Sequence, residues 1–204
     1  MNPRVKVRKG EGERMATNSF IAKEERQPDG SLKYTGIFCH FDGDLKWNGA
    51  LLKNYWCDQN KLNMLFDMGD ISGLGKNIGE KHPFIYMTEE YTREQQIKWQ
   101  SMVTAYHRDR GDPLKPARVF NSFSDLADYV CKDTFCDYLY IFSEKEQWQV
   151  GRVTRNDISL AALTDDAIKA NSVPTETYYS IHITADQIEN YLTQDQTQGR
   201  GRGR

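Results

Sequence analysis

The side chains with the greatest chemical potential follow one another in the run Cys39-His40-Phe41-Asp42-Gly43. A cysteine beside a histidine suggests a thiol nucleophile with its base. Adjacent residues on a strand point to opposite faces, however, so Cys39 and His40 are not expected to form a catalytic pair. His40 and Asp42 share a face, about 6–7 Å apart along the strand, which suits an oriented histidine or a polar site completed from elsewhere. The alternative is a buried Cys39 and a His40 that bonds to loop backbone.

A second group of reactive side chains is the charged run His107-Arg108-Asp109-Arg110-Gly111-Asp112. Two arginines close together can make bidentate contacts with an anion, so Arg108 and Arg110 predict an anion- or partner-binding loop. The first three residues of the run resemble the catalytic tripeptide of protein kinases, but the sequence has no matching glycine-rich loop and no Asp-Phe-Gly. The alternative is a surface loop whose charges pair with one another.

The remaining candidates surround the turn that follows the first run. Gly43 ends the expected strand, and Trp47 begins the apolar stripe of the helix after it. Several aromatic residues either line a pocket or belong to the core: Trp47, Tyr55, Trp56, Trp99 and Tyr106. No catalytic residue is assigned. The predicted binding residues are His40, Asp42, Gly43, Trp47, His107, Arg108, Asp109 and Arg110.

The four cysteines give little support for a metal site or for disulfides. Cys131 and Cys136 have four residues between them, a spacing that zinc knuckles use, but no second pair follows. The first residues contain no apolar segment of the kind that directs secretion, so reduced thiols are expected. We therefore expect no metal and no cofactor.

The charge distribution argues against a nucleic-acid groove on the folded part of the chain. The formal net charge is −2; residues 1–14 and the last five residues carry +3 each, which leaves residues 15–199 at −8. An acidic body with basic ends makes weak RNA or DNA binding through those ends the only nucleic-acid hypothesis. No run approaches the roughly 18 apolar residues that a membrane helix needs, so no membrane partner is expected.

Three segments are expected along the chain. Residues 1–14 form a predicted disordered basic extension; because purine-rich codons can encode Arg8–Arg14, Met15 is a candidate native start. Residues 15–192 have the length of a single domain. Residues 193–204 are rich in Gln, Gly and Arg and are predicted to be a disordered tail.

Hydrophobic periodicity and turn signals predict an α+β fold with a mainly antiparallel sheet and short inserted helices. Pro28-Asp29-Gly30 predicts a hairpin turn between the first two strands. Thr92 and Gln95 resemble a capping box, but the aromatic residues after them favour a strand. Strands are expected over 19–26, 31–41, 99–107, 118–120, 137–143, 147–153 and 177–183. Helices are expected from Trp47 and after the capping residues Asp58, Ser122, Thr164 and Thr184.

Several short segments resemble a pattern in small uncharacterised proteins of bacteriophages and related mobile elements. The segments are Cys39–Gly43, Gly49 with Leu51-Leu52 and Tyr55, Gly69–Gly75, and Tyr106 with Arg108–Gly111. The resemblance covers roughly residues 15–155 and includes the start Met15-Ala16-Thr17. It implies a phage origin and no particular chemistry. The chain departs from the pattern at Asp44-Leu45-Lys46, where those proteins commonly have an aromatic residue and a Pro-rich turn.

Our first hypothesis is a non-enzymatic, phage-encoded accessory protein in the cytoplasm of the infected bacterium. It would bind a host protein through Cys39–Gly43 and Arg108–Arg110, with host takeover or counter-defence as its role. The alternative is a small hydrolytic enzyme, or a protein that binds a small molecule or nucleotide. Convergence on one pocket of the residues that this alternative needs would favour it. Those residues are His40, Asp42, His107 and Arg108. The sequence does not predict the oligomeric state.

Overall fold

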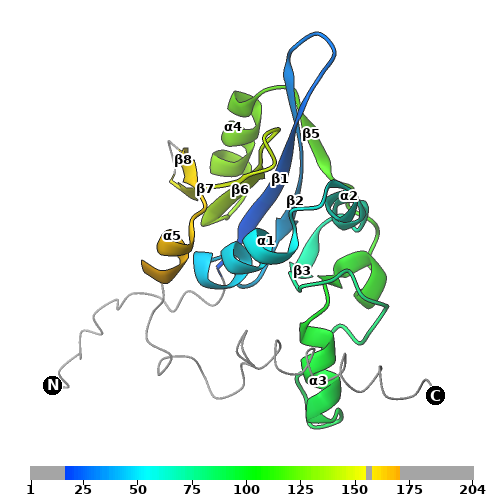
Figure 1. The fold of residues 1–204 in the computed structure, drawn as a ribbon. Helices are drawn as coiled ribbons and strands as arrows, with labels where there is room; N and C mark the ends of the chain where they lie inside the picture. Colours follow the sequence, from blue (N-terminus) through cyan, green and yellow to red (C-terminus); the bar gives the residue numbers. More distant parts are fainter. Residues whose placement is uncertain (1–16, 155–157, 171–204) are drawn as a thin grey trace, which may run out of the picture.

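The computed structural model describes residues 17–154 and 158–170, which form eight strands and seven helical segments (Figure 1). The strands are β1 (Ser19–Arg26), β2 (Leu32–Cys39), β3 (Ile71–Gly73), β4 (Thr104–Ala105), β5 (Arg118–Phe120), β6 (Tyr138–Phe142), β7 (Trp148–Val153) and β8 (Ile158–Ala162). The α-helices are α1 (Ala50–Tyr55), α2 (Gln59–Asp67), α3 (Arg93–Gln100), α4 (Phe123–Asp133) and α5 (Asp165–Ala170). Two π-helical turns are η1 (Leu45–Gly49) and η2 (Tyr106–Arg110).

The strands form one sheet in the order β4-β3-β2-β1-β6-β7-β8, with β5 also paired to β2. The expected α+β composition is confirmed, but the prediction of a mainly antiparallel sheet is wrong because the sheet is mixed. β1 pairs in parallel with β6, and β2 pairs in parallel with β3. Parallel neighbours need a long crossover connection, and the inserted helices supply one in each case. The helices were therefore anticipated, but not their consequence for strand direction.

The predicted hairpin of β1 and β2 lies at the centre of the sheet. Its register pairs Ser19 with Cys39 and Arg26 with Leu32. In the turn, the Asp29 carboxylate accepts hydrogen bonds from the backbone N–H of Ser31 at 2.9 Å and from its hydroxyl at 2.6 Å. Such Asx turns make Asp a favoured turn residue. The hairpin signal in the sequence was thus read correctly.

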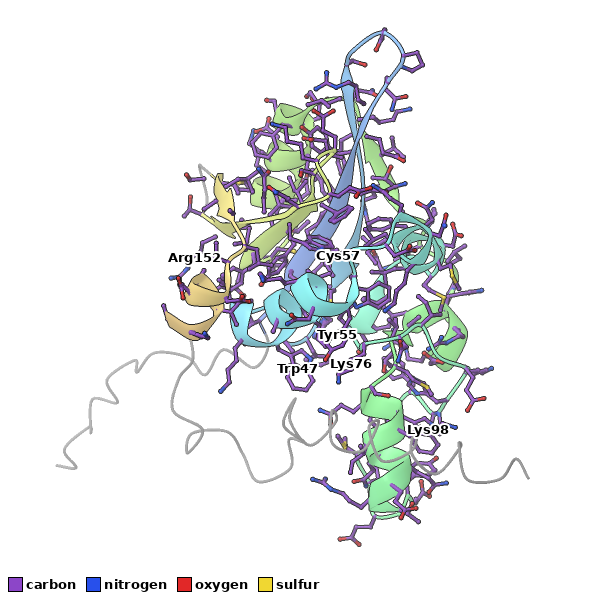
Figure 2. All side chains as sticks on the ribbon, in the orientation of Figure 1. Trp47, Tyr55, Cys57, Lys76, Lys98 and Arg152 are labelled. Carbon is purple, nitrogen blue, oxygen red and sulfur yellow. The ribbon has the colours of Figure 1, made fainter. Side chains whose placement is uncertain are left out.

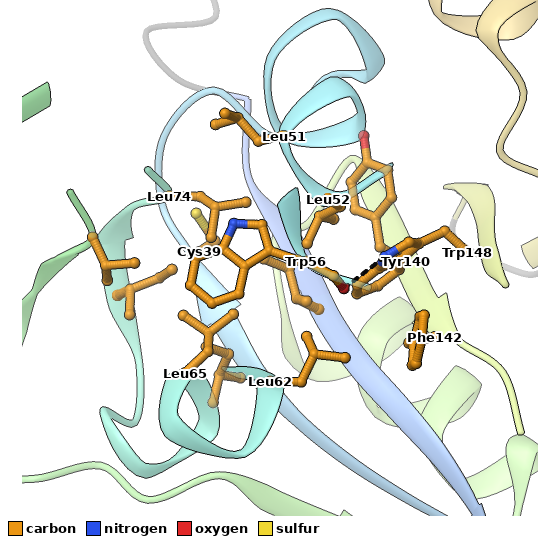
Figure 3. Close-up of a cluster of buried hydrophobic side chains, with 14 of the residues drawn as sticks. Cys39, Leu51, Leu52, Trp56, Leu62, Leu65, Leu74, Tyr140, Phe142 and Trp148 are labelled. Atoms are coloured by element: carbon orange, nitrogen blue, oxygen red, sulfur yellow. Dashed lines mark hydrogen bonds between the residues drawn. The ribbon is translucent and has the colours of Figure 1, made fainter. Parts of the chain in front are cut away.

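Both faces of the sheet are covered, which explains why the central strands are apolar on both sides. On one face, Leu126 and Val130 of α4 pack with Phe20 and Leu139. On the other, α1 and α2 enclose Trp56, which lies among leucines and Cys39 (Figure 3). The Trp56 indole donates to the carbonyl of Gly75 at 2.9 Å, and the Trp148 indole donates to the carbonyl of Trp56 at 3.1 Å. Both buried indoles therefore have the partner that burial requires.

The strand predicted over 99–107 is wrong. Residues 99 and 100 instead end α3, which lies apart from the other α-helices in Figure 1. β4 contains only two residues, and η2 begins at Tyr106. Thr92 and Gln95 make both hydrogen bonds of a capping box, at 2.9 and 3.3 Å. This start signal fixes the helix because each bond satisfies an N–H group that would otherwise lack a partner. The aromatic residue that suggested a strand, Trp99, packs on other rings at the end of α3.

The remaining predicted helices and strands were partly confirmed. The helices after Asp58, Ser122 and Thr164 are confirmed, and the first two capping side chains accept a hydrogen bond from the third residue of their helix. β8 was not predicted. The strand expected over 177–183 and the helix after Thr184 lie outside the described residues, as do residues 1–14 and 193–204. Within 17–154 and 158–170, no helix combines the length and apolar character needed to cross a membrane.

Candidate functional site

Three of the predicted binding residues line one pocket of about 280 Å³ at the end of β2. They are His40, His107 and Arg110, which come from segments almost seventy residues apart. The other lining residues are Phe38, Asp70, Tyr106, Asp112, Pro113 and Lys115. The volume is close to the lower end of the range for small-molecule sites.

His40 reaches the pocket because β2 continues one residue beyond its last sheet position. Its backbone N–H donates to the carbonyl of Ile71 at 3.2 Å, which keeps the chain extended. The imidazole lies between two aromatic rings, with centroids 6.0 Å from Phe38 and 4.3 Å from Phe41. Its ring nitrogens make no hydrogen bond to any of the described residues, so the ring is positioned by packing and its nitrogens are available to a ligand.

His107 is positioned by a hydrogen bond to its own loop. Its Nδ1 lies 2.9 Å from the carbonyl oxygen of Asp112, a geometry in which Nδ1 is the donor. This contact selects the tautomer that leaves Nε2 with a lone pair. No described residue contacts Nε2 through a hydrogen bond, so this nitrogen is open to a proton or to a ligand.

Arg110 lies on the rim of the pocket in a fixed position. Its guanidinium stacks over Tyr106 and Phe84, at 4.5 and 4.8 Å from the ring centroids. Its Nε donates to Asp112 at 2.8 Å, and its Nη2 bonds the second oxygen of that carboxylate. These hydrogen bonds raise the pKa of Arg110 and lower the pKa of Asp112. Nη1 still has no hydrogen-bond partner among residues 17–154 and 158–170.

The Asp70 carboxylate, also in the pocket wall, is held by an arginine. Nη1 and Nη2 of Arg118 donate to its two oxygens at 2.7 and 2.9 Å, and the backbone N–H of Phe38 adds a third bond at 3.0 Å. Hydrogen bonding to Asp70, followed by its charge, raises the pKa of Arg118 against the opposing effect of burial. This ion pair joins β5 to the segment before β3 and leaves Asp70 little capacity to bind a ligand.

Arg108 and Asp109 point away from the pocket into a buried cluster. Arg108 donates from Nε to Asp109 at 2.8 Å and from Nη1 to the carbonyl of Ile78 at 2.8 Å, and its Nη2 bonds the carbonyl of Val103. Asp109 also accepts the backbone N–H groups of Ala105, at 2.7 Å, and His82, at 3.2 Å. These two residues therefore hold the segment together rather than facing a ligand.

The pKa of Asp109 reflects this environment. Burial on its own raises it, but hydrogen bonds from Arg108, Ala105 and His82 outweigh burial and hold the pKa below its usual range. The carboxylate thus stays ionised in the interior. The Ala105 N–H that donates to it belongs to the residue just before η2. The run expected to be a loop is thus a helical turn that ends at the left-handed Gly111.

Asp42, Gly43 and Trp47 do not line the pocket. Asp42 is in the left-handed region, with φ 56°. A Cβ on Gly43 would lie 2.7 Å from the carbonyl oxygen of Thr17, to which its own N–H donates, so only glycine fits there. Figure 2 shows Trp47 beside Tyr55 below α1, and both rings pack against the core. These residues shape the turn between β2 and η1.

Cys39 is buried and chemically quiet. Burial raises the pKa of its thiol to about 12, despite a hydrogen bond from Asn48 at 3.3 Å. The reactive form of cysteine is the thiolate, so this residue is not a nucleophile at neutral pH. As predicted, it lies on the opposite face of β2 from Phe38, the neighbour of the His40 ring. In the part of the chain that the structure describes, no three His, Cys, Asp or Glu side chains are grouped to hold a metal ion.

Sequence reasoning missed four charged or polar members of the site and its support. Asp70 and Arg118 are 48 positions apart, and no local pattern connects them. Asp112 was part of the charged run but was treated as its end, and Lys115 lies between Leu114 and Pro116 in an undistinguished loop. The glycine just before Asp70, Gly69, was a usable signal that another segment of the chain comes close at this point. A Cβ on Gly69 would meet the carbonyl oxygen of Lys115 at 2.2 Å, so this glycine lets the two pocket segments approach.

No family model matches this chain, and neither a curated protein nor a solved structure matches it. The resemblance to phage proteins therefore stays a hypothesis that rests on the sequence segments alone.

Proposed function

We propose that this protein binds a small polar molecule in the pocket between the end of β2 and the segment 106–115. The observation that carries the proposal is the convergence of His40, His107 and Arg110 on one concavity, each with at least one nitrogen that no described residue uses. Polar groups that converge in a pocket without satisfying one another are typical of a binding site. The small-molecule alternative from the sequence also included Asp42 and Arg108, but these two residues support the surrounding structure and do not line the pocket.

Binding is favoured over catalysis by the state of the groups nearby. The Cys39 thiol is buried with a raised pKa, and the carboxylates of Asp70 and Asp112 are each engaged by an arginine. A hydrolytic reaction needs an activated nucleophile or a free general base close to the substrate. The two histidines keep open nitrogens, but neither is hydrogen-bonded to a carboxylate of the described residues that would orient it.

Native mass spectrometry of the full chain, purified from bacterial cells without denaturation, tests the proposal. We expect a mass above that of the polypeptide, and a small molecule released on denaturation. The double variant His40→Ala/His107→Ala should lose that mass, whereas Arg152→Ala, on the distant strand β7, should keep it. A molecule retained by the double variant would locate the ligand elsewhere and contradict the proposal.

A second candidate function is binding of a host bacterial protein, the role suggested by the phage-like segments. Phe41 and Leu114, the sequence neighbours of His40 and Lys115, are 43% and 46% exposed. Exposed apolar residues next to a polar pocket are common at protein interfaces. Affinity purification from bacterial lysate should return a saturable partner that Phe41→Ser weakens and Val119→Ser, at another exposed apolar site, does not. Recovery of no saturable partner would remove this candidate.

A further inference from the structure

The carboxylates of the pocket are already neutralised. Asp70 receives two hydrogen bonds from Arg118, and Asp112 receives two from Arg110. A carboxylate in a bidentate pair with a guanidinium has its charge compensated and its preferred acceptor directions occupied. Neither group is therefore free to attract a cation.

The unengaged groups in the same wall are donors or bases. Lys115 has three N–H donors and no hydrogen bond or ion pair to a side chain in the described ranges. Arg110 keeps Nη1, His107 keeps Nε2, and both ring nitrogens of His40 are open. Arg110 compensates Asp112 within the lining, and Arg118, which is not a lining residue, compensates Asp70. Lys115 then adds an uncompensated positive charge to the pocket wall before any histidine is protonated.

Arg110 is held in place before any ligand binds. Its stacking on Tyr106 and Phe84, together with its bonds to Asp112, fixes the guanidinium before anything binds. A donor held in place loses less conformational entropy when it forms a hydrogen bond to a ligand. The rings of Phe38 and Tyr106 supply apolar surface next to these donors.

We infer that the ligand of this pocket is a small organic anion of the phosphate or carboxylate class, an assignment that rests on the proposed binding function. The anionic group lies between Lys115, Arg110 and the two histidines, and the organic part contacts Phe38 and Tyr106. A cationic ligand would find no free carboxylate, and a neutral ligand would leave the charge of Lys115 uncompensated.

Four probes with the same ring and different head groups test the inference: phenyl phosphate, benzoate, benzyl alcohol and benzylamine. Each is titrated into the ¹⁵N-labelled full chain at low salt, and binding is followed by the backbone amide shifts of residues 106–115 and by the histidine side-chain signals. Phenyl phosphate and benzoate separate the two anion types. We expect both anions to saturate the pocket shifts, with benzyl alcohol and benzylamine at least about tenfold weaker.

Lys115→Gln and Lys145→Gln form a matched pair of charge-removing variants. Lys145 lies in the turn between β6 and β7 and outside the pocket. We expect Lys115→Gln to weaken the anions about fivefold or more and to flatten the salt dependence of their binding, while Lys145→Gln leaves both unchanged.

The outcomes distinguish the anionic character of the ligand from the proposed binding function itself. Equal or tighter pocket binding of benzyl alcohol or benzylamine would overturn the anion assignment and leave the binding function standing. Anion binding that is the same in Lys115→Gln and the unmodified protein would also overturn the assignment. If no probe of any charge shifts the pocket signals in a saturable way, the proposed function fails, and the inference fails with it.

Discussion

Arg108 and Arg110 lie two positions apart on the same turn, yet their environments differ completely. The Arg108 side chain is 16% exposed and bonds Asp109 and the carbonyls of Ile78 and Val103. The Arg110 side chain is 48% exposed, stacks on two rings and keeps one nitrogen open at the pocket. In one cluster, every charge is used to hold the chain; in the other, charge is left available.

The comparison shows that a charged run in a sequence does not indicate which charges face a ligand. In η2, neighbouring residues project in different directions around the axis, so one helical turn divides the run between interior and surface. Asp109 selects the inward partner because its carboxylate is fully buried and needs compensation. Asp112 lies after the turn and engages the outward arginine.

The largest effect is expected from Asp109→Asn, which removes the buried negative charge of the interior cluster. Arg108 would then lack its partner, and the free energy of unfolding should fall by about 3 kcal/mol. Chemical denaturation measures this change. Asp128→Asn is the control, because Asp128 forms an exposed i,i+4 pair with Lys132 and should cost about 0.5 kcal/mol or less. Equal losses for the two variants would mean that the interior cluster is not structural.

Arg118→Met should give the next largest loss, about 2 kcal/mol, since it leaves the buried Asp70 carboxylate without its guanidinium. Arg26→Met is the matched control, since Arg26 makes a two-point contact with Glu144 on the surface, at 2.6 and 2.7 Å. The control should change stability much less than Arg118→Met, because exposed ion pairs contribute little. Arg118→Met should also weaken anion binding, because Asp70 would then present an uncompensated negative charge to the pocket. Unchanged stability would contradict the role given to Arg118.

Acid should destabilise the fold by protonating Asp109, whose pKa is lowered in the folded protein. A carboxylate with a folded pKa below its unfolded value, near 4, stabilises the fold at all higher pH. That contribution is lost as the pH falls through the folded pKa. The stability difference between the unmodified protein and Asp109→Asn should therefore be constant from pH 7 to about 5 and shrink below pH 4. Denaturation midpoints at each pH measure it, and a difference that grows on acidification would reverse the assignment.

The smallest change in stability is expected from Arg110→Ala, whose denaturation midpoint should match that of the unmodified protein, because its ion pair is exposed. The same variant should weaken phenyl phosphate binding about tenfold. A stable protein that binds poorly contrasts with Asp109→Asn, for which a large loss of stability is expected. A large loss of stability in Arg110→Ala would remove the distinction between the two clusters.

The features predicted correctly have local causes. The Asp29 turn and the helix starts at Asp58 and Ser122 are each set by contacts within a few residues. The prediction of a strand over 99–107 failed because aromatic content was given more weight than the capping box of Thr92 and Gln95. The structure contains both hydrogen bonds of that box. Three of the nine pocket-lining residues were predicted to bind a ligand, since His40, His107 and Arg110 carry recognisable chemistry. Asp70 and Arg118 were missed because only the folded sheet brings β5 next to the segment before β3.

The parallel pairing of β1 with β6 has a consequence for how the chain is made. Ser19 pairs with Tyr138, so one edge of the central strand has no partner until nearly all of the sheet has been synthesised. Until then, β1 presents buried positions such as Phe20 and Ile21 beside unpaired backbone groups. An apolar strand with an open edge is a template for association with other chains. Ribosomes that stall before residue 138 should therefore release chains that aggregate, and those that pass residue 162, where β8 ends and the sheet is complete, should release chains that remain dispersed.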